Sequence, residues 1–150
     1  MPSIPNSRVL IVATDGFEEW ELFGPREILQ KRGAEVVLAS LKLDPIQATV
    51  HDDPGKTIRP DITMDEASAD DFDALVLPGG VRNPDHLRLH DNVIELIKDF
   101  DRQGKAIGAI CHAPWLLVER TSSVAALPRA GPRSGRISGM RAPGWSTNRQ

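Results

Sequence analysis

Residues 8–14 are Arg8-Val9-Leu10-Ile11-Val12-Ala13-Thr14, a continuous apolar run rich in branched side chains, and the turn Asp15-Gly16 follows it. Such a run is typical of a parallel strand that is covered on both faces. Residues 17–32 then carry apolar side chains at roughly helical spacing, and Gly33 is a suitable helix stop. We expect a break or a delayed helix start near Pro25, because proline cannot donate a backbone hydrogen bond.

The rest of the first 120 residues continues this alternation of strands and helices. Buried strands are predicted over residues 35–40, 72–77 and 105–110, and a helix over residues 91–102 with Asp91 as its cap. The prolines and short alternating pieces of residues 42–70 indicate a small hairpin or an edge excursion. A turn at Cys111 leads into a helix through residue 118. We therefore predict an α/β fold, an open parallel sheet with helices on both faces and its chemistry at the carboxyl ends of the strands.

The composition fits one soluble domain of 150 residues, 40% of them hydrophobic and 26% charged. One cysteine cannot form an internal disulfide, no apolar run is long enough to cross a bilayer, and the first residues do not resemble a signal peptide. A formal net charge of −3 disfavours binding to DNA or RNA. We expect a cytoplasmic protein with neither a membrane nor a nucleic acid as its partner.

Residues 121–150 differ from the rest of the chain in charge and composition. All 21 Asp and Glu residues lie in residues 1–120, whereas the tail carries five arginines and no acidic residue. The tail is rich in Ser, Gly, Pro and Ala and has no amphipathic period, so we predict that it is disordered. The chain is thus divided into a domain over residues 1–120 and a basic tail.

Cys111 is the candidate nucleophile. It lies where a predicted strand turns into a helix, and such a turn lifts the sulfur above the edge of the sheet. The helix N-terminus favours the thiolate, which is the reactive form. Most free cysteines are instead small buried hydrophobic residues, so its position alone leaves both interpretations open.

Other strand ends supply possible partners for this thiol. Gly79-Gly80 allows close backbone approach, so its amides and that of His112 suit an oxyanion, although a tight turn also explains the glycines. His112 is a candidate base, and Glu18 can hydrogen-bond the thiol or influence its pKa, or simply complement the helix dipole. Asp85 can orient a histidine but also fits plain turn chemistry. Glu19 and Glu21 are interpreted as surface or structural residues.

No cofactor or metal is expected. The glycine pair lacks the pattern of a phosphate-binding loop. The remaining histidines have no metal-ligand spacing with the cysteine, which argues against a zinc site; these are His51, His86 and His90.

Four stretches, in this order and spacing, closely resemble the PfpI intracellular protease family. They are Asp15-Gly16-Phe17-Glu18-Glu19-Trp20-Glu21, Leu75-Val76-Leu77-Pro78-Gly79-Gly80, Asn83-Pro84-Asp85 and Ala109-Ile110-Cys111-His112-Ala113-Pro114-Trp115-Leu116-Leu117-Val118. The superfamily is similar to class I glutamine amidotransferases and includes protein deglycases. The resemblance covers residues 8 to about 119.

The resemblance implies a flavodoxin-like fold and a homo-oligomer, commonly a dimer or a hexamer. It implies that Cys111 is the nucleophile, that His112 is its base, and that Glu18 lies beside the thiol. Asp85 would orient the histidine, in some members across a subunit interface, and the amides of Gly80 and His112 would bind the oxyanion. Peptidase, deglycase and glyoxalase activities all occur, so a peptide, a glycated amine or a small dicarbonyl remains open as substrate.

The sequence departs from the family pattern after Glu119, where members continue with further strands and a closing helix. Reading the codons of residues 121–150 one nucleotide out of register permits a sequence similar to what members carry at this point. We therefore expect a one-nucleotide deletion near codons 119–120; the alternative is a lineage-specific tail. The sheet is then incomplete on its C-terminal side, and an inactive chain is one outcome of that truncation.

Three other functions compete with the cysteine hydrolase. The first is a non-catalytic stress chaperone or redox sensor, in which the Cys111 thiol is oxidised to a sulfinate beside Glu18. A glutamine amidotransferase-like domain would need a distant histidine and glutamate near its C-terminus, and no such pair is present. A transcription regulator would need an added helix-turn-helix, which the sequence lacks.

Overall fold

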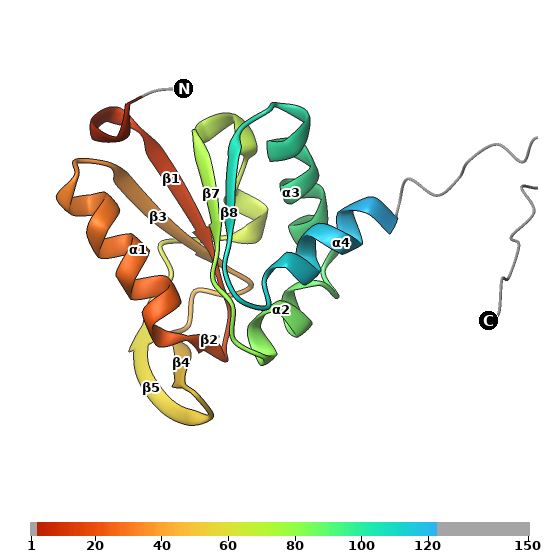
Figure 1. Cartoon of the computed structure of the whole chain (residues 1–150). Helices are drawn as coiled ribbons and strands as arrows, with labels where there is room; N and C mark the ends of the chain where they lie inside the picture. Colours follow the sequence, from red (N-terminus) through yellow and green to blue (C-terminus); the bar gives the residue numbers. More distant parts are fainter. Residues whose placement is uncertain (1–2, 123–150) are drawn as a thin grey trace, which may run out of the picture.

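The computed structural model describes residues 3–122 of the chain. Five strands form one sheet in which every neighbouring pair is parallel (Figure 1). This confirms the predicted open parallel sheet. In spatial order the strands are β6 (Ile62–Thr63), β3 (Glu35–Ser40), β1 (Arg8–Val12), β7 (Ala74–Leu77) and β8 (Ala106–Ala109).

Helices cover both faces of the sheet, as predicted (Figure 1). On one face Val9 and Ile11 of β1 pack in a cluster with Leu22 of α1. On the other face Leu10 and Val12 belong to a larger cluster that the remaining helices join. The alternation along β1 is the period of two that a strand imposes on its side chains. The helices are α1 (Glu19–Lys31), α2 (Arg82–Leu87), α3 (Asp91–Arg102) and α4 (Pro114–Ser122).

A second, three-stranded sheet lies beside the carboxyl end of β1. It consists of β2 (Phe17–Glu18), β4 (Ile46–Val50) and β5 (Asp53–Ile58), in that order. β4 and β5 form an antiparallel hairpin in which Val50 pairs with Asp53, which confirms the hairpin predicted within residues 42–70. Three short 3₁₀ turns complete the described elements: η1 (Ile4–Asn6), η2 (Met64–Glu66) and η3 (Ala69–Asp71).

Two details of the predicted helices are wrong. No break occurs at Pro25, because α1 runs from Glu19 to Lys31 with Pro25 inside it. Proline in the second turn frees one carbonyl near the start of the helix, and the helix tolerates that loss. Asp91 does not cap α3; the N-cap position is His90, whose side chain makes no capping bond, and Asp91 is the first helical residue. A carboxylate in the first turn still complements the helix dipole.

The predicted tail, residues 121–150, lies almost entirely outside the described residues. The proposed shift of reading frame is therefore untested by the structure. Within residues 3–122, no helix is long and apolar enough to cross a membrane.

Candidate active site

The carboxyl ends of β1, β7 and β8 meet at one cavity of about 490 Å³. Parallel strands bring their carboxyl ends to one edge of the sheet, where ligands of such folds bind. A thiol, two imidazoles and three carboxylates line this cavity, together with apolar groups. The lining residues are Glu18, Trp20, Glu21, His51, Asp52, Gly80, Val81, Cys111 and His112.

Cys111 occupies a strained turn between β8 and α4. Its φ of 56° is unusual for a residue other than glycine, and its side chain is exposed. The turn is fixed by a hydrogen bond of 3.0 Å that the Ala113 amide donates to the Ile110 carbonyl. Sγ of Cys111 lies 3.2 Å from Nδ1 of His112, so one proton can pass between the adjacent side chains. A thiol within hydrogen-bond reach of an imidazole is the arrangement that nucleophilic catalysis by cysteine requires.

The Gly79-Gly80 turn passes directly beneath this cysteine. A Cβ added at Gly79 would lie 2.8 Å from the Cβ of Cys111 and 2.7 Å from the Ile110 carbonyl oxygen. Gly80 has a φ of 88°, and a Cβ there would lie 2.8 Å from the Glu18 amide nitrogen. A larger residue at Gly79 would therefore displace the segment that carries the thiol, and one at Gly80 would displace the backbone of residues 16–18.

Two amides of residues that line the cavity have no hydrogen-bond partner within residues 3–122. Within residues 3–122, neither the amide of Gly80 nor that of His112 donates a hydrogen bond to another part of the chain. Both residues line the cavity beside Cys111. Unpaired amides beside a nucleophile are the usual donors to a developing oxyanion.

The structure separates the roles of Glu18 and Glu21. Glu21 was interpreted as a surface or structural residue, and the structure gives it a structural contact: its carboxylate accepts a 2.7 Å hydrogen bond from the Gly79 amide, next to Cys111. Glu18 also lines the cavity, but its carboxylate accepts from the His51 amide at 3.2 Å. The reason is the start of α1: Glu18 precedes the helix, whereas the side chain of Glu21 points back toward the helix N-terminus.

Within one chain the structure does not bring Asp85 to the histidine. Asp85 lies on α2, its side chain is 64% exposed, and its carboxylate pairs with Arg88 Nε at 3.2 Å. It is absent from the lining of the cavity. An orienting role for Asp85 toward His112 therefore requires a second copy of the chain.

Asn83 is the site residue that sequence reasoning missed. Turn chemistry was one of the two interpretations of the segment Asn83-Pro84-Asp85, but the segment lies in α2, and the Asn83 side chain is fully buried. Its Oδ1 accepts from the Thr14 amide at 2.7 Å, and its Nδ2 donates to the carbonyls of Pro78 at 2.8 Å and Gly79 at 3.2 Å. One side chain thus joins the ends of β1 and β7.

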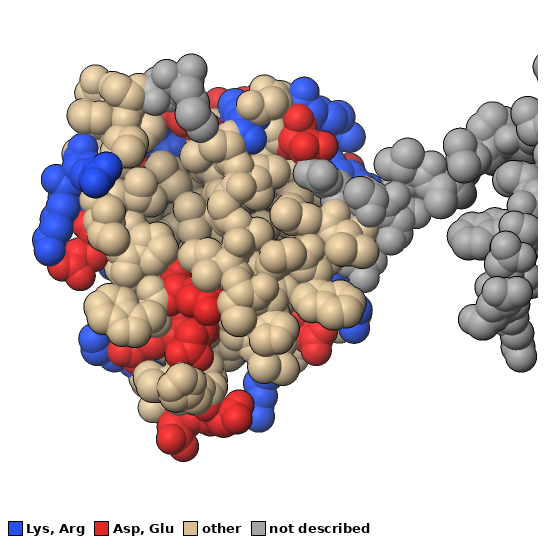
Figure 2. All heavy atoms as spheres, viewed as in Figure 1, with Lys and Arg blue, Asp and Glu red and all other residues tan. Residues whose placement is uncertain are grey.

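Charge around the cavity is mainly negative. Figure 2 shows Asp and Glu side chains gathered on this face near the N-terminal end of α1. Glu18, Glu21 and Asp52 line the cavity, and no Lys or Arg among the described residues does so. In the same part of the chain, no group of three or more His, Cys, Asp or Glu side chains is arranged to hold a metal ion.

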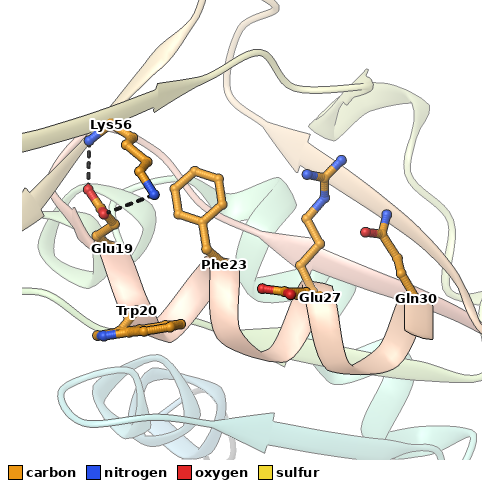
Figure 3. A pocket seen from close by; sticks show the side chains of 7 residues that line it. Glu19, Trp20, Phe23, Glu27, Gln30 and Lys56 are labelled. Atoms are coloured by element: carbon orange, nitrogen blue, oxygen red, sulfur yellow. Dashed lines mark hydrogen bonds and ion pairs between the residues drawn. The ribbon is translucent and has the colours of Figure 1, made fainter. Parts of the chain in front are cut away.

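A second hollow, of about 350 Å³, lies along the outer side of α1 (Figure 3). Lys56 closes one end, because its amide donates to the Glu19 carboxylate at 2.7 Å and its Nζ lies 5.6 Å from the centre of the Phe23 ring. The lining contains no thiol, hydroxyl or imidazole.

The comparisons with known proteins agree with this geometry. Residues 7–124 match the model of the DJ-1/PfpI family. A deglycase of Pyrococcus abyssi is 40% identical over 111 residues, which are 74% of this chain and 64% of the relative. Protein/nucleic acid deglycase 2 of Escherichia coli is 33% identical over 122 residues, covering 75% of this chain and 64% of the relative.

A solved structure is similar in fold as well. Drosophila melanogaster DJ-1beta superposes with a TM-score of 0.69 at 28% identity, over 77% of this chain and 60% of that chain. The chain thus spans a little under two thirds of the length of the curated relatives that it matches.

Proposed function

Because the chain belongs to the DJ-1/PfpI family, we propose that it is a cysteine-dependent hydrolase of the deglycase type, with Cys111 attacking a carbonyl carbon. The observation that carries the proposal is the contact of 3.2 Å between Cys111 Sγ and His112 Nδ1 on a strained turn that opens into the cavity. The names of the relatives favour a glycated amine as substrate over a peptide or a dicarbonyl.

The first half of the reaction uses groups that already lie together. His112 takes the thiol proton, and the Cys111 thiolate attacks the carbonyl carbon to form a C–S bond. The carbonyl electron pair moves to oxygen, where the amides of Gly80 and His112 receive it. In an amide, where the attacked carbon carries the nitrogen, the C–N bond then breaks to release the amine, and water cleaves the thioester to restore the thiol. In a glycated amine the nitrogen is on a carbinol carbon instead, so the C–N bond breaks first as the carbinol hydroxyl gives up its proton and nitrogen gains one, which leaves a carbonyl for the thiolate to attack.

The two glutamates have different parts in this proposal. Glu21 holds the Gly79 amide and so fixes the turn whose next amide binds the oxyanion. Glu18 fixes the tip of the β4–β5 hairpin against the cavity through the His51 amide. Asp85 contributes only in a homo-oligomer, which we include in the proposal.

A redox sensor is the second candidate, because Cys111 is the one cysteine of the chain and is exposed. A lone exposed thiol beside carboxylates can be oxidised to a sulfinate. Titration with peroxide, followed by intact mass, would then show oxygen added at Cys111 in a protein that turns over no carbonyl substrate. A cytoplasmic location is part of either proposal, since a reducing compartment keeps this thiol free.

Turnover of a glycated-lysine peptide by the full chain and by Cys111→Ser tests the hydrolase. The serine variant should lose kcat/KM by at least about a thousandfold, because its hydroxyl is a far weaker nucleophile. The Pyrococcus abyssi relative serves as the positive control for the assay. Equal rates for both forms, or turnover by the relative but none by this chain, would contradict the proposal.

A further inference from the structure

His51 shares an uncommon backbone conformation with the candidate nucleophile. Among the described residues other than glycine, only His51 and Cys111 have positive φ, 58° and 56°. The two residues come from different sheets and are far apart in sequence, yet both line the same cavity. Strained residues that persist in this way cluster at functional sites.

The hairpin that carries His51 would favour a different residue. His51 and Asp52 form a two-residue turn, since Val50 pairs with Asp53. Turns of this length favour glycine or asparagine where φ is positive, because a Cβ is disfavoured there. A histidine at this position is not explained by the needs of the turn.

The tip of the hairpin is held against the cavity. Glu18 accepts the His51 amide, and the Thr49 hydroxyl donates to the Phe17 carbonyl at 3.3 Å. β4 also pairs with β2, whose residues precede α1 directly. The backbone of His51 is therefore fixed at one wall of the cavity, which Cys111 also lines.

We propose that His51 is a second proton-transfer residue of this site, acting on the leaving amine while His112 acts on the thiol. The inference rests on the proposed hydrolase function. A cavity of about 490 Å³ has room for a substrate. The substrate itself then links Cys111 to His51, so no direct contact between the two side chains is needed.

The protons balance over one cycle. His112 begins neutral and takes the thiol proton as the C–S bond forms. His51 begins protonated and donates its proton to nitrogen as the C–N bond breaks, so the amine leaves neutral. His51 then takes a proton from the water that attacks the thioester, and His112 returns its proton to the departing thiolate. The net reaction is addition of one water across the C–N bond, and both histidines end as they began.

Charged groups from several elements face His51. Three carboxylates share the cavity with it, Glu18 from β2, Glu21 from α1 and Asp52 from the same turn. Cys111 and His112 face it from the turn after β8. Arg82 of α2 opposes them, since it lines a smaller hollow together with His51. His51 thus shares its surroundings with three carboxylates and one cation.

Two substrates with different leaving groups test the role. An alkylamide must receive a proton at nitrogen to leave, whereas the phenolate of a 4-nitrophenyl ester leaves without one. His51→Asn tolerates the positive φ but cannot transfer a proton. We expect it to lower kcat/KM for the amide by at least about a hundredfold and to leave acylation of Cys111 by the ester unchanged.

Controls separate this role from a structural one. His86→Asn, an exposed histidine outside the cavity, should match the wild-type chain with both substrates. His51→Gly should raise the Tm by a few degrees, since glycine suits the turn, and should still lose amide turnover. Loss of both reactions in His51→Asn, or of neither, would overturn the role. A wild-type chain that shows no Cys111-dependent reaction with either substrate would instead overturn the hydrolase proposal itself.

Discussion

At the residue scale, Asn83 shows how one buried side-chain amide can position a site without lining its cavity. Its side chain is fully buried and satisfies three backbone groups, at Thr14, Pro78 and Gly79. Buried polar groups without partners cost free energy, so these bonds hold the ends of two strands at a fixed distance. The Gly79-Gly80 turn beneath Cys111 depends on this link.

Asn83→Ala should therefore destabilise the fold. It leaves the Thr14 amide and two carbonyls without their buried partner, which we expect to lower the free energy of unfolding by about 2–4 kcal/mol. Urea unfolding measures the change. Asn92→Ala is the matched control, because that side chain is exposed and donates a hydrogen bond of 3.2 Å to Asp65. Its effect on the free energy of unfolding should stay within about 0.5 kcal/mol. Equal effects of the two variants would contradict the account.

Some site residues could be predicted from the sequence and others could not, for a physical reason. Cys111, His112 and Gly80 follow predicted strands directly, so their place at the sheet edge follows from strand direction alone. Glu21 depends on where α1 begins, and a shift of the helix start rotates every side chain on it. The position of the Asn83 side chain depends on the short helix α2, whose sequence also fits a turn, since Pro84 suits both structures.

At the scale of elements, apolar periodicity in the sequence predicted a helix that packing in the core stabilises. The bounds of α3 agree with the prediction at both ends, and the expected apolar face is buried: Val93, Ile94, Ile97 and Phe100. β2 and α2 were missed because two and six residues are too short to show a period. Both elements are held by tertiary contacts, which a local pattern does not record.

Two leucines near the end of α2 test this packing. Leu87 is fully buried in the larger cluster, whereas Leu89, two residues later, is 73% exposed. Leu87→Ala should lower the free energy of unfolding by about 2–5 kcal/mol, because it leaves a cavity in the core. Leu89→Ala should change it by no more than about 0.5 kcal/mol. Urea unfolding of both variants decides, and a small effect at Leu87 would contradict the assignment of α2 to the core.

At the scale of the whole molecule, the sheet ends at β8. Among residues 3–122, no strand pairs with the outer edge of β8, and Figure 2 shows mainly uncharged side chains on the face it shares with α4. An unpaired edge can recruit another chain. The parallel arrangement was predictable from the alternation of elements, but the order of the strands was not, because β6 is only two residues long.

A charge on this edge should reduce association of the chain. Gly108 of β8 is exposed, and a Cβ there would meet only the Leu75 carbonyl oxygen at 3.9 Å, so Gly108→Lys fits without strain. We expect it to lower light scattering at high protein concentration, since lysine on an edge strand opposes pairing. Asn6→Lys, an exposed residue of η1, adds the same charge elsewhere. The same reduction in both variants would indicate an effect of net charge and would contradict association through the β8 edge.

The central claim is that Cys111 is the nucleophile of this molecule, and the most direct measurement is the mass of the covalent intermediate. The full chain is mixed with a 4-nitrophenyl ester, quenched with acid within the first turnover, and analysed intact and after digestion. The account predicts one added acyl group, on Cys111, which is absent from Cys111→Ser. An unmodified chain, or an acyl group on a lysine that persists in Cys111→Ser, would contradict it.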